Sequence, residues 1–164
     1  LTNAEADLTV ITDMDAPADI VWDAISHLAK RAIWQVTIKE MMRLQGDTDA
    51  IGEVHSCIHS GGVKIVHLTT AIDEENRRKT ERTWVSPAIM KDIYVTLAAE
   101  PLTEDRTRVS FFASFKPRFP ILSHIARPFF VRFMTSDIRK DMAALKEFCE
   151  TGAVTTGQPA KLEV

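Results

Sequence analysis

The segment PFFVRFMTSDIRKDMAALKEFCE, residues 128–150, decides the fold of this 164-residue chain. Apolar side chains recur in it every three or four residues, which is the period of one face of an α-helix. The pattern predicts a helix from Pro128 to Glu150, about 34 Å long at ~1.5 Å per residue and ended by Gly152. A stripe of this length must be buried, so the rest of the chain has to supply an apolar surface. The stripe consists of Val131, Met134, Ile138, Met142, Leu145 and Cys149.

The preceding residues supply that surface as a run of short strands. Apolar and polar residues alternate between 36 and 116, and turn residues such as Gly61 and Gly62, which favour a tight two-residue hairpin, divide the run. A first strand over Leu8–Met14 and two short helical segments from Pro17 onward come before it. This order predicts an α+β domain in which the long helix covers the concave face of one curved antiparallel sheet. Because a straight helix cannot touch a curved sheet along its whole length, the remaining space between them is either packed shut or forms a pocket.

Three stretches resemble the START-like superfamily, which includes polyketide cyclases, coenzyme Q-binding proteins and plant carriers of hydrophobic ligands. They are DAPADIVWDAIS at 15–26, AIWQ at 32–35 and IGEVHSCIHSGGVKI at 51–65. The resemblance covers about Leu8 to Glu150 and implies a helix-grip fold, with the sheet wrapped around the C-terminal helix and a ligand cavity inside. It carries over no catalytic residue, because the superfamily shares none. We therefore expect one START-like ligand-binding domain over 1–152 and a flexible tail over 153–164.

Composition narrows the classes of partner. Lys and Arg number 20 against 23 Asp and Glu, and basic residues gather only in short groups, so nucleic acid is not an expected partner. No apolar run approaches the ~18 residues that would predict an integral membrane segment. The two cysteines, Cys57 and Cys149, lie in different predicted elements and form no disulfide framework, which favours a reducing, cytoplasmic setting. The oligomeric state stays open, and a homo-oligomer is compatible with the sequence.

Aromatic, methionine and small apolar side chains on the predicted inner face are the candidates for the cavity wall. Such a stripe often packs as plain core, and the family resemblance favours lining here. We expect the pocket to be mainly apolar and to lie between the sixth and seventh strands and the front half of the last helix. The predicted ligand-binding residues are Trp34, Glu40, Trp84, Val95, Leu97, Phe111, Ala113, Phe115, Phe133 and Met134.

Glu40 is the candidate for acid–base chemistry. It falls between Ile38 and Met42 on the apolar face of its strand, where desolvation would raise the pKa of its carboxyl group. Two structural explanations compete with this role: a β-bulge that turns Glu40 outward, or an ion pair with an inward Arg82. The sequence favours the structural explanations, so no catalytic residue is assigned.

His55, Cys57 and His59 form an H-x-C-x-H run whose side chains share one face of a strand. The outer two lie ~13 Å apart at ~3.3 Å per residue. One zinc ion, with bonds of about 2.0–2.3 Å, cannot bind all three. At most two of these side chains could join ligands from elsewhere.

His67 is the nearest candidate for an additional metal ligand. A two-residue turn at Gly61 and Gly62 places it opposite Ser56, on the other face of the sheet. Only a three-residue loop would bring it alongside His55. The sequence therefore predicts no metal and no cofactor, and a fold that needs none.

The function favoured by these patterns is binding of a small, largely apolar ligand of the lipid, polyketide or aromatic type. A cyclase or dehydratase that uses Glu40 or a cavity histidine is one alternative, and a sensor or interaction module of a larger protein is another. A carboxylate inside the cavity without a charge partner would favour the enzyme. A dry, apolar cavity would favour the binding protein, and a filled core would favour the interaction module.

Overall fold

The computed structural model describes residues 5–85, 90–117, 120–155 and 157–163. The chain folds as strand, two helices, six strands, long helix and a final short strand. The elements are β1 (Leu8–Met14), α1 (Ala18–Ser26), α2 (Leu28–Trp34), β2 (Ile38–Gln45), β3 (Val54–His59), β4 (Lys64–Asp73), β5 (Arg78–Val85), β6 (Met90–Thr103), β7 (Arg106–Pro117), α3 (Pro120–Thr151) and β8 (Lys161–Glu163).

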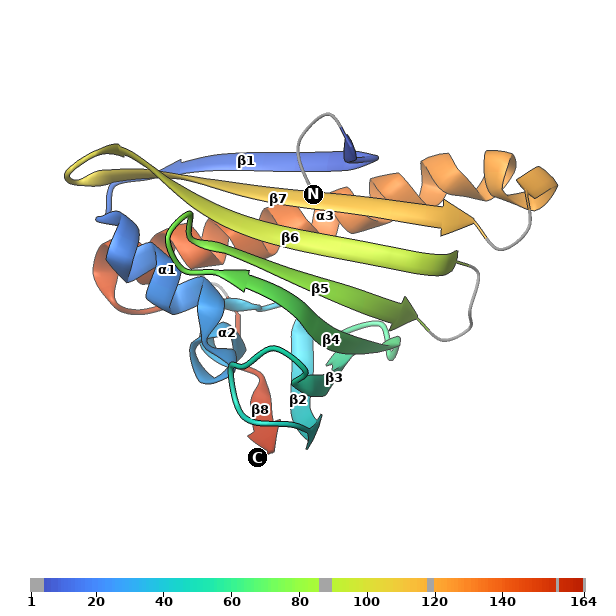
Figure 1. Ribbon diagram of the computed structural model, residues 1–164, viewed down its shortest axis with the longest axis horizontal. Helices are drawn as coiled ribbons and strands as arrows, with labels where there is room; N and C mark the ends of the chain where they lie inside the picture. The colour runs from blue at the N-terminus through green and yellow to red at the C-terminus, as the bar shows by residue number, and fades with distance from the viewer. Residues whose placement is uncertain (1–4, 86–89, 118–119, 156, 164) are drawn as a thin grey trace.

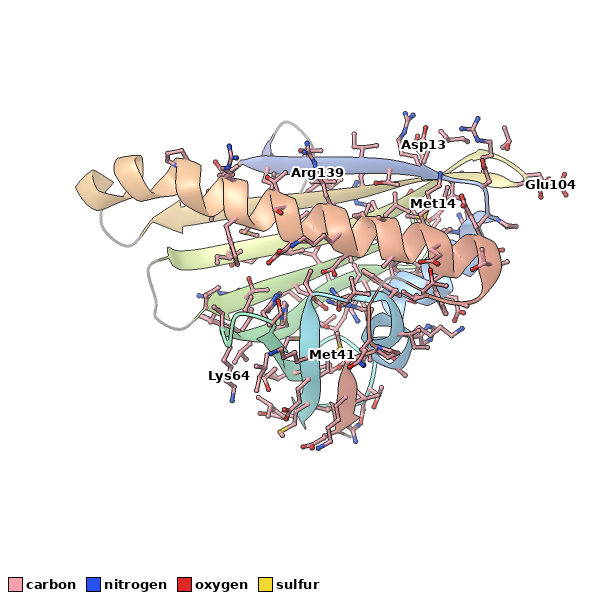
Figure 2. The ribbon with its side chains drawn as sticks, turned by 180° about the vertical axis from the view of Figure 1, so that it is seen from behind. Asp13, Met14, Met41, Lys64, Glu104 and Arg139 are labelled. Atoms are coloured by element: carbon pink, nitrogen blue, oxygen red, sulfur yellow. The ribbon has the colours of Figure 1, made fainter. Side chains whose placement is uncertain are left out.

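The strands within the described residues form one eight-stranded sheet in the order β1-β7-β6-β5-β4-β3-β2-β8. Every neighbouring pair is antiparallel except β2 and β8, which run parallel. The sheet curls around one face, where α3 runs along the sheet and α1 and α2 lie near one end (Figure 1). From the opposite side, α3 crosses in front of the strands (Figure 2). The predicted α+β helix-grip fold is confirmed.

The first two helices form where the sequence changes from strand to helical period. Pro17 precedes α1, and Asp19 in its first turn suits the positive end of the helix dipole. The extended backbone of His27 separates α1 from α2. The indole N–H of Trp34 donates a 2.8 Å hydrogen bond to the Ala24 carbonyl, which fixes α2 against α1 at the edge of the concave face.

The last helix begins eight residues before the predicted start, at Pro120, and Pro128 lies inside it. A proline removes one backbone hydrogen bond, and the turns on both sides preserve the helix here. Met142 and Leu145 are buried as expected, whereas Met134 and Ile138 are only half-buried. None of the described helices is long and apolar enough to cross a membrane.

The expectation of a flexible tail over 153–164 does not hold for its last residues. The Ala160 amide donates a 2.7 Å hydrogen bond to the Ala32 carbonyl, and β8 then pairs with β2. Gly157 has a φ of +117°, and a Cβ there would lie 2.8 Å from the Cβ of Val36. This close approach requires glycine, and backbone pairing of three residues leaves no periodic signal in the sequence.

The concave face of the sheet has two chemically different halves. Its inward positions on β6 and β7 are apolar, as alternation predicts. On β3, β4 and β5 the inward positions are mostly polar. The apolar half includes Ile93, Val95, Leu97, Val109, Phe111, Ala113 and Phe115. The polar half includes His55, Cys57, His59, His67, Thr69, Lys79, Glu81 and Thr83.

Candidate functional site

A cavity of about 300 Å³ lies between the concave face of the sheet and α3. Its apolar wall comes from β6, β7 and α3, with Val95, Leu97, Phe111 and Ile138 among its residues. Phe133 also borders the cavity and is 57% exposed, so it stands at the opening. The opposite wall carries the polar side chains of α2, β4 and β5.

Six of the ten predicted ligand-binding residues border this cavity, and four do not. Trp34 comes from α2, Val95 and Leu97 from β6, Phe111 from β7, and Phe133 and Met134 from α3. The four that lie elsewhere are Glu40, Trp84, Ala113 and Phe115.

Ala113 and Phe115 have the predicted inward orientation but belong to the packed core beside the cavity, with 0% and 6% of their surfaces exposed. Trp84 points to the outer face of β5, where the Arg82 guanidinium lies 5.0 Å from its ring centroid. The prediction for Trp84 was wrong because the inward residues of β5 are polar and its aromatic residue faces out.

Glu40 is turned away from the cavity by a β-bulge. Ile38 pairs with His59 and Glu40 with Ile58, so β2 contains one extra residue between these two pairs. Ile38 therefore keeps its place in the cavity wall, and Glu40 lies half-buried beside β8, opposite Lys161. The bulge is the structural explanation that the sequence left open for this residue.

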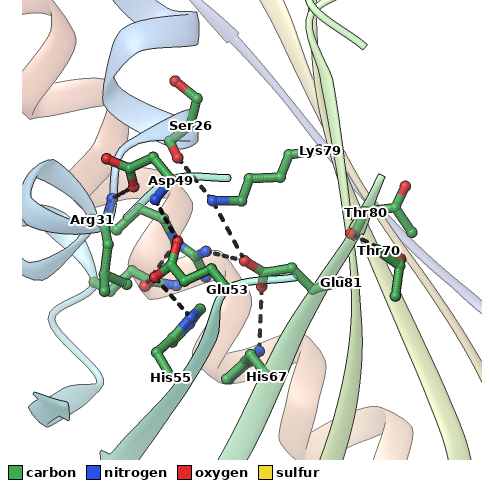
Figure 3. Close-up of polar contacts among 12 residues, drawn as sticks. Ser26, Arg31, Asp49, Glu53, His55, His67, Thr70, Lys79, Thr80 and Glu81 are labelled. Atoms are coloured by element: carbon green, nitrogen blue, oxygen red, sulfur yellow. Dashed lines mark hydrogen bonds and ion pairs between the residues drawn. The ribbon is translucent and has the colours of Figure 1, made fainter. Parts of the chain in front are cut away.

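The polar wall is built around the buried ion pair of Arg31 and Glu81, whose side chains are 3% and 5% exposed. Arg31 donates to a Glu81 oxygen, and the Lys79 ammonium lies 3.9 Å from the same oxygen while donating to the Ser26 carbonyl (Figure 3). Burial would raise the pKa of Glu81, but Arg31 and His67 together hold it well below its usual range. Glu81 is therefore an anion with its charge matched inside the protein.

Asp141 is the second buried carboxyl group of the cavity. The amide and hydroxyl groups of Thr37 donate hydrogen bonds of 2.9 and 2.8 Å to its two oxygens. Burial raises the pKa of Asp141 to about 6, although these hydrogen bonds act in the opposite direction. Among the described residues, no basic side chain forms an ion pair with Asp141.

Two histidines of the wall are uncharged near neutral pH. Burial lowers the pKa of His67 to about 4, against the effect of Glu81. Burial likewise lowers the pKa of His59, which borders the cavity from the end of β3. A neutral imidazole can accept or donate a hydrogen bond to a bound molecule.

The hairpin between β3 and β4 is closed by the pair His59 and Val63, so its loop has three residues, 60–62, not two. The His59 amide donates to the Val63 carbonyl at 2.9 Å, and Gly62 adopts a φ of +78°. His55 therefore pairs with His67, and their rings stack with centroids 4.8 Å apart. The predicted position of His67 on the other face was wrong, because one added loop residue reverses the side of every later side chain.

The sequence held signals for the polar residues that were missed. Asp141 lies three residues after Ile138 and four before Leu145, which places it on the apolar stripe of α3. Glu81 alternates with Lys79 and Thr83 on one face of β5. A search for hydrophobic periodicity assigns such a polar face to solvent.

A family model described as polyketide cyclase / dehydrase and lipid transport matches residues 5–150. The chain belongs to this family. The predicted START-like relationship is thereby confirmed over nearly the whole chain. No curated protein sequence matches it.

Several solved structures superpose on most of the chain. A protein from Nitrosospira multiformis has a TM-score of 0.69 at 20% identity, over 88% of this chain and 98% of its own. Truncated norcoclaurine synthase from Thalictrum flavum has a TM-score of 0.71 at 16% identity, over 86% and 91%. Ginseng major latex-like protein 151 from Panax ginseng has a TM-score of 0.67 at 14% identity, over 87% and 95%. At these identities the similarity shows a common fold.

Proposed function

We propose that this domain binds a small, largely apolar molecule that carries at least one polar group. The cavity of about 300 Å³ is the observation that supports this function. Its volume lies at the lower end of the range for small-molecule sites, and its walls combine apolar area with a few placed polar groups. A compound of one or two rings, or a short acyl chain, suits this space.

The two walls assign different parts of such a ligand to different sides. The hydrocarbon part would lie against β6, β7 and α3, between residues such as Val95, Phe111 and Met134. The polar group would meet His67 of β4, or Asp141, the buried carboxyl group that α3 directs toward Thr37. A hydroxyl, carbonyl or amine group can form a hydrogen bond with either.

The expected affinity is moderate. A ligand that buries ~200 Å² of apolar surface gains roughly 5 kcal/mol at ~25 cal/mol per Å². This corresponds to a Kd of the order of 0.1 mM before any polar contact, and each good hydrogen bond adds about 1 kcal/mol. Dissociation constants in the micromolar range are therefore expected for well-matched compounds.

Native mass spectrometry of gently purified protein tests this proposal. We expect a fraction of the chains to carry one small molecule, which is released by denaturation and identified by its mass. Norcoclaurine synthase, which shares this fold, has been observed in complex with dopamine and hydroxybenzaldehyde, so aromatic amines and aldehydes are the first compounds to titrate into emptied protein. Absence of a co-purified molecule, together with no saturable binding from a panel of aromatic and acyl compounds, would contradict the proposal.

Acid–base catalysis on the bound molecule is the second candidate function. Asp141, whose pKa burial raises to about 6, and the neutral His67 both border the cavity. Burial thus raises the pKa of the carboxyl group and lowers the pKa of the imidazole. Two groups of one cavity with pKa values shifted in this way can take separate roles as acid and base. The carboxyl group of this candidate enzyme is Asp141 in place of Glu40. Its test is turnover of a bound carbonyl compound that Asp141→Asn abolishes while binding remains.

The third candidate, an interaction module, requires a filled core, and the cavity argues against it. A cytoplasmic setting stays a prediction, as does the lipid, polyketide or aromatic class of the ligand.

A further inference from the structure

Three potential metal ligands meet on the inner faces of β3 and β4. One ligand atom from each of His55, Cys57 and His67 lies within 4.8 Å of those of the other two. His55 and Cys57 are fully buried, and the His67 side chain is 12% exposed at the cavity. The three-residue loop at 60–62 creates this cluster, because it places His67 directly opposite His55.

The two histidines are buried without the hydrogen bonds that buried rings normally have. Within the part of the chain that the structure describes, neither ring nitrogen of His55 or His67 has a hydrogen-bond partner. Buried polar atoms in native proteins are almost always paired with protein, water or an ion. The Nδ1 atom of each ring has only a carboxylate oxygen at 3.6 or 3.3 Å, and the Nε2 atoms have no partner among the described residues, so the two Nε2 atoms point to a bound group near the neighbouring thiol.

Each histidine also has a carboxylate beside the same ring nitrogen. Glu53 Oε1 lies 3.6 Å from His55 Nδ1, and Glu81 Oε2 lies 3.3 Å from His67 Nδ1 (Figure 3). In metal sites a ligating histidine commonly directs its second N–H to a carboxylate, which fixes the tautomer and orients the ring. This arrangement assigns Nδ1 to the carboxylates and leaves Nε2 of both rings to face an ion.

We propose that His55 Nε2, His67 Nε2 and Cys57 Sγ bind one thiophilic metal ion of the Zn²⁺ or Cu⁺ kind. Two imidazoles and a thiolate are ligands that both ions prefer. Metal–ligand bonds of about 2.0–2.3 Å in tetrahedral geometry place neighbouring ligand atoms ~3.3–4.0 Å apart. The ligand atoms here lie within 4.8 Å of one another, so they have to approach by roughly 1 Å on binding. The rings lie 8° from parallel, and a rotation about their χ2 angles would make the two nitrogens converge. On binding, the Cys57 thiol releases its proton to solvent.

The surrounding charges accommodate this ion. The cations Arg31 and Lys79 are matched by the carboxylates of Glu81 and Glu53. The Cys57 thiolate then neutralises Cu⁺ completely and leaves Zn²⁺ with one excess charge. His67 borders the cavity, which provides the path of entry. Metal binding here does not require the proposed organic ligand, and an ion on His67 leaves Asp141 as the polar contact for that ligand.

Titration of chelator-treated protein with Co²⁺ tests the ligand set, because thiolate coordination gives a near-ultraviolet charge-transfer band. We expect the band to saturate at one ion per chain and to disappear when one equivalent of Zn²⁺ is added. Cys57→Ser should remove the band and weaken Zn²⁺ binding by about 100-fold or more, since even residues outside the ligand set contribute 10–100-fold. His55→Gln and His67→Gln should each weaken binding similarly.

Two matched controls separate this site from incidental binding. Cys149→Ser removes the other cysteine, and His59→Gln removes the third member of the H-x-C-x-H run. Both variants should bind Co²⁺ and Zn²⁺ as the wild-type protein does. Glu53→Gln should weaken binding by ~10–100-fold while keeping the charge-transfer band, because Glu53 only positions a ligand.

Competition with chromogenic chelators, under anaerobic conditions for Cu⁺, distinguishes the two ions. Tight binding of either ion at one per chain, lost in Cys57→Ser, supports the proposal. The proposal is overturned if neither ion binds, or if Cys57→Ser binds as wild type while its circular dichroism spectrum shows a folded protein. Cys57→Ala serves as a second variant should the serine destabilise the core.

Discussion

Replacing Asp141 by Asn should change how the stability of the protein depends on pH. Burial raises the pKa of this carboxyl group from 3.8 to about 6 in the folded protein. Between these two values the folded chain binds a proton that the unfolded chain has already released, so stability falls as the pH rises. The contribution is fully present below about pH 4 and is lost as the pH passes through 6.

The size of the effect follows from the shift. About two pKa units at 1.36 kcal/mol each give a total loss of roughly 3 kcal/mol, of which about 2 kcal/mol falls between about pH 4.5 and about pH 7.5. An asparagine does not titrate, and its carbonyl oxygen can still accept one hydrogen bond from Thr37. The free energy of unfolding of Asp141→Asn, minus that of the wild-type protein, should therefore rise by about 2 kcal/mol across this interval.

Urea unfolding curves of both proteins at the two pH values measure this difference, and the contributions of other titrating groups cancel. A constant or falling difference for Asp141→Asn would refute the assignment of Asp141 as a buried carboxyl group without a cation.

Three further predictions concern the packing. Leu145→Ala, at a fully buried side chain, should lower the free energy of unfolding in urea by ~2–5 kcal/mol. Ile138 borders the cavity, so Ile138→Ala should lower it by about half of that or less. Equal losses would place both side chains in a filled core. Arg31→Met should cost ~3–5 kcal/mol because it removes the cation that is hydrogen-bonded to buried Glu81. Adding Glu81→Leu should recover part of the loss, and a double variant less stable than Arg31→Met would contradict this. Gly157→Ala should release β8 and speed amide exchange over Lys161–Glu163, and unchanged exchange would show that the contact with Val36 does not fix the tail.

The fold could be predicted because its signals are periodic and long. The stripe from Val131 to Cys149 required a partner surface, and the meander between β2 and β7 was the surface available. The parts that escaped prediction depend on single residues or on backbone alone. One bulge residue in β2 reversed the side of Glu40, and one extra loop residue reversed the side of His67. No periodicity reports either event.

The apolar half of the site was predictable and the polar half was not. Val95, Leu97 and Phe111 sit on strands whose apolar residues face inward, so alternation identified them. On β5 the inward residues are Lys79, Glu81 and Thr83, which alternation alone would place in solvent. The fold buries all three, and Lys79 and Glu81 form an ion pair there. The charge of Glu81 is matched there by Lys79 and by Arg31, which lies fifty residues away in sequence.

Dye binding by two neighbouring tryptophan variants tests the existence of a ligand-accessible cavity most directly. Val95 and Ala113 are register partners on β6 and β7, but Val95 borders the cavity and Ala113 is fully buried in the core. An environment-sensitive apolar dye should bind the wild-type protein saturably, at one per chain. Val95→Trp should abolish this binding with little change in stability, whereas Ala113→Trp should overpack the core and destabilise it by ~1–3 kcal/mol. Wild-type protein that binds no dye saturably, or Val95→Trp protein that binds it unchanged, would contradict the account.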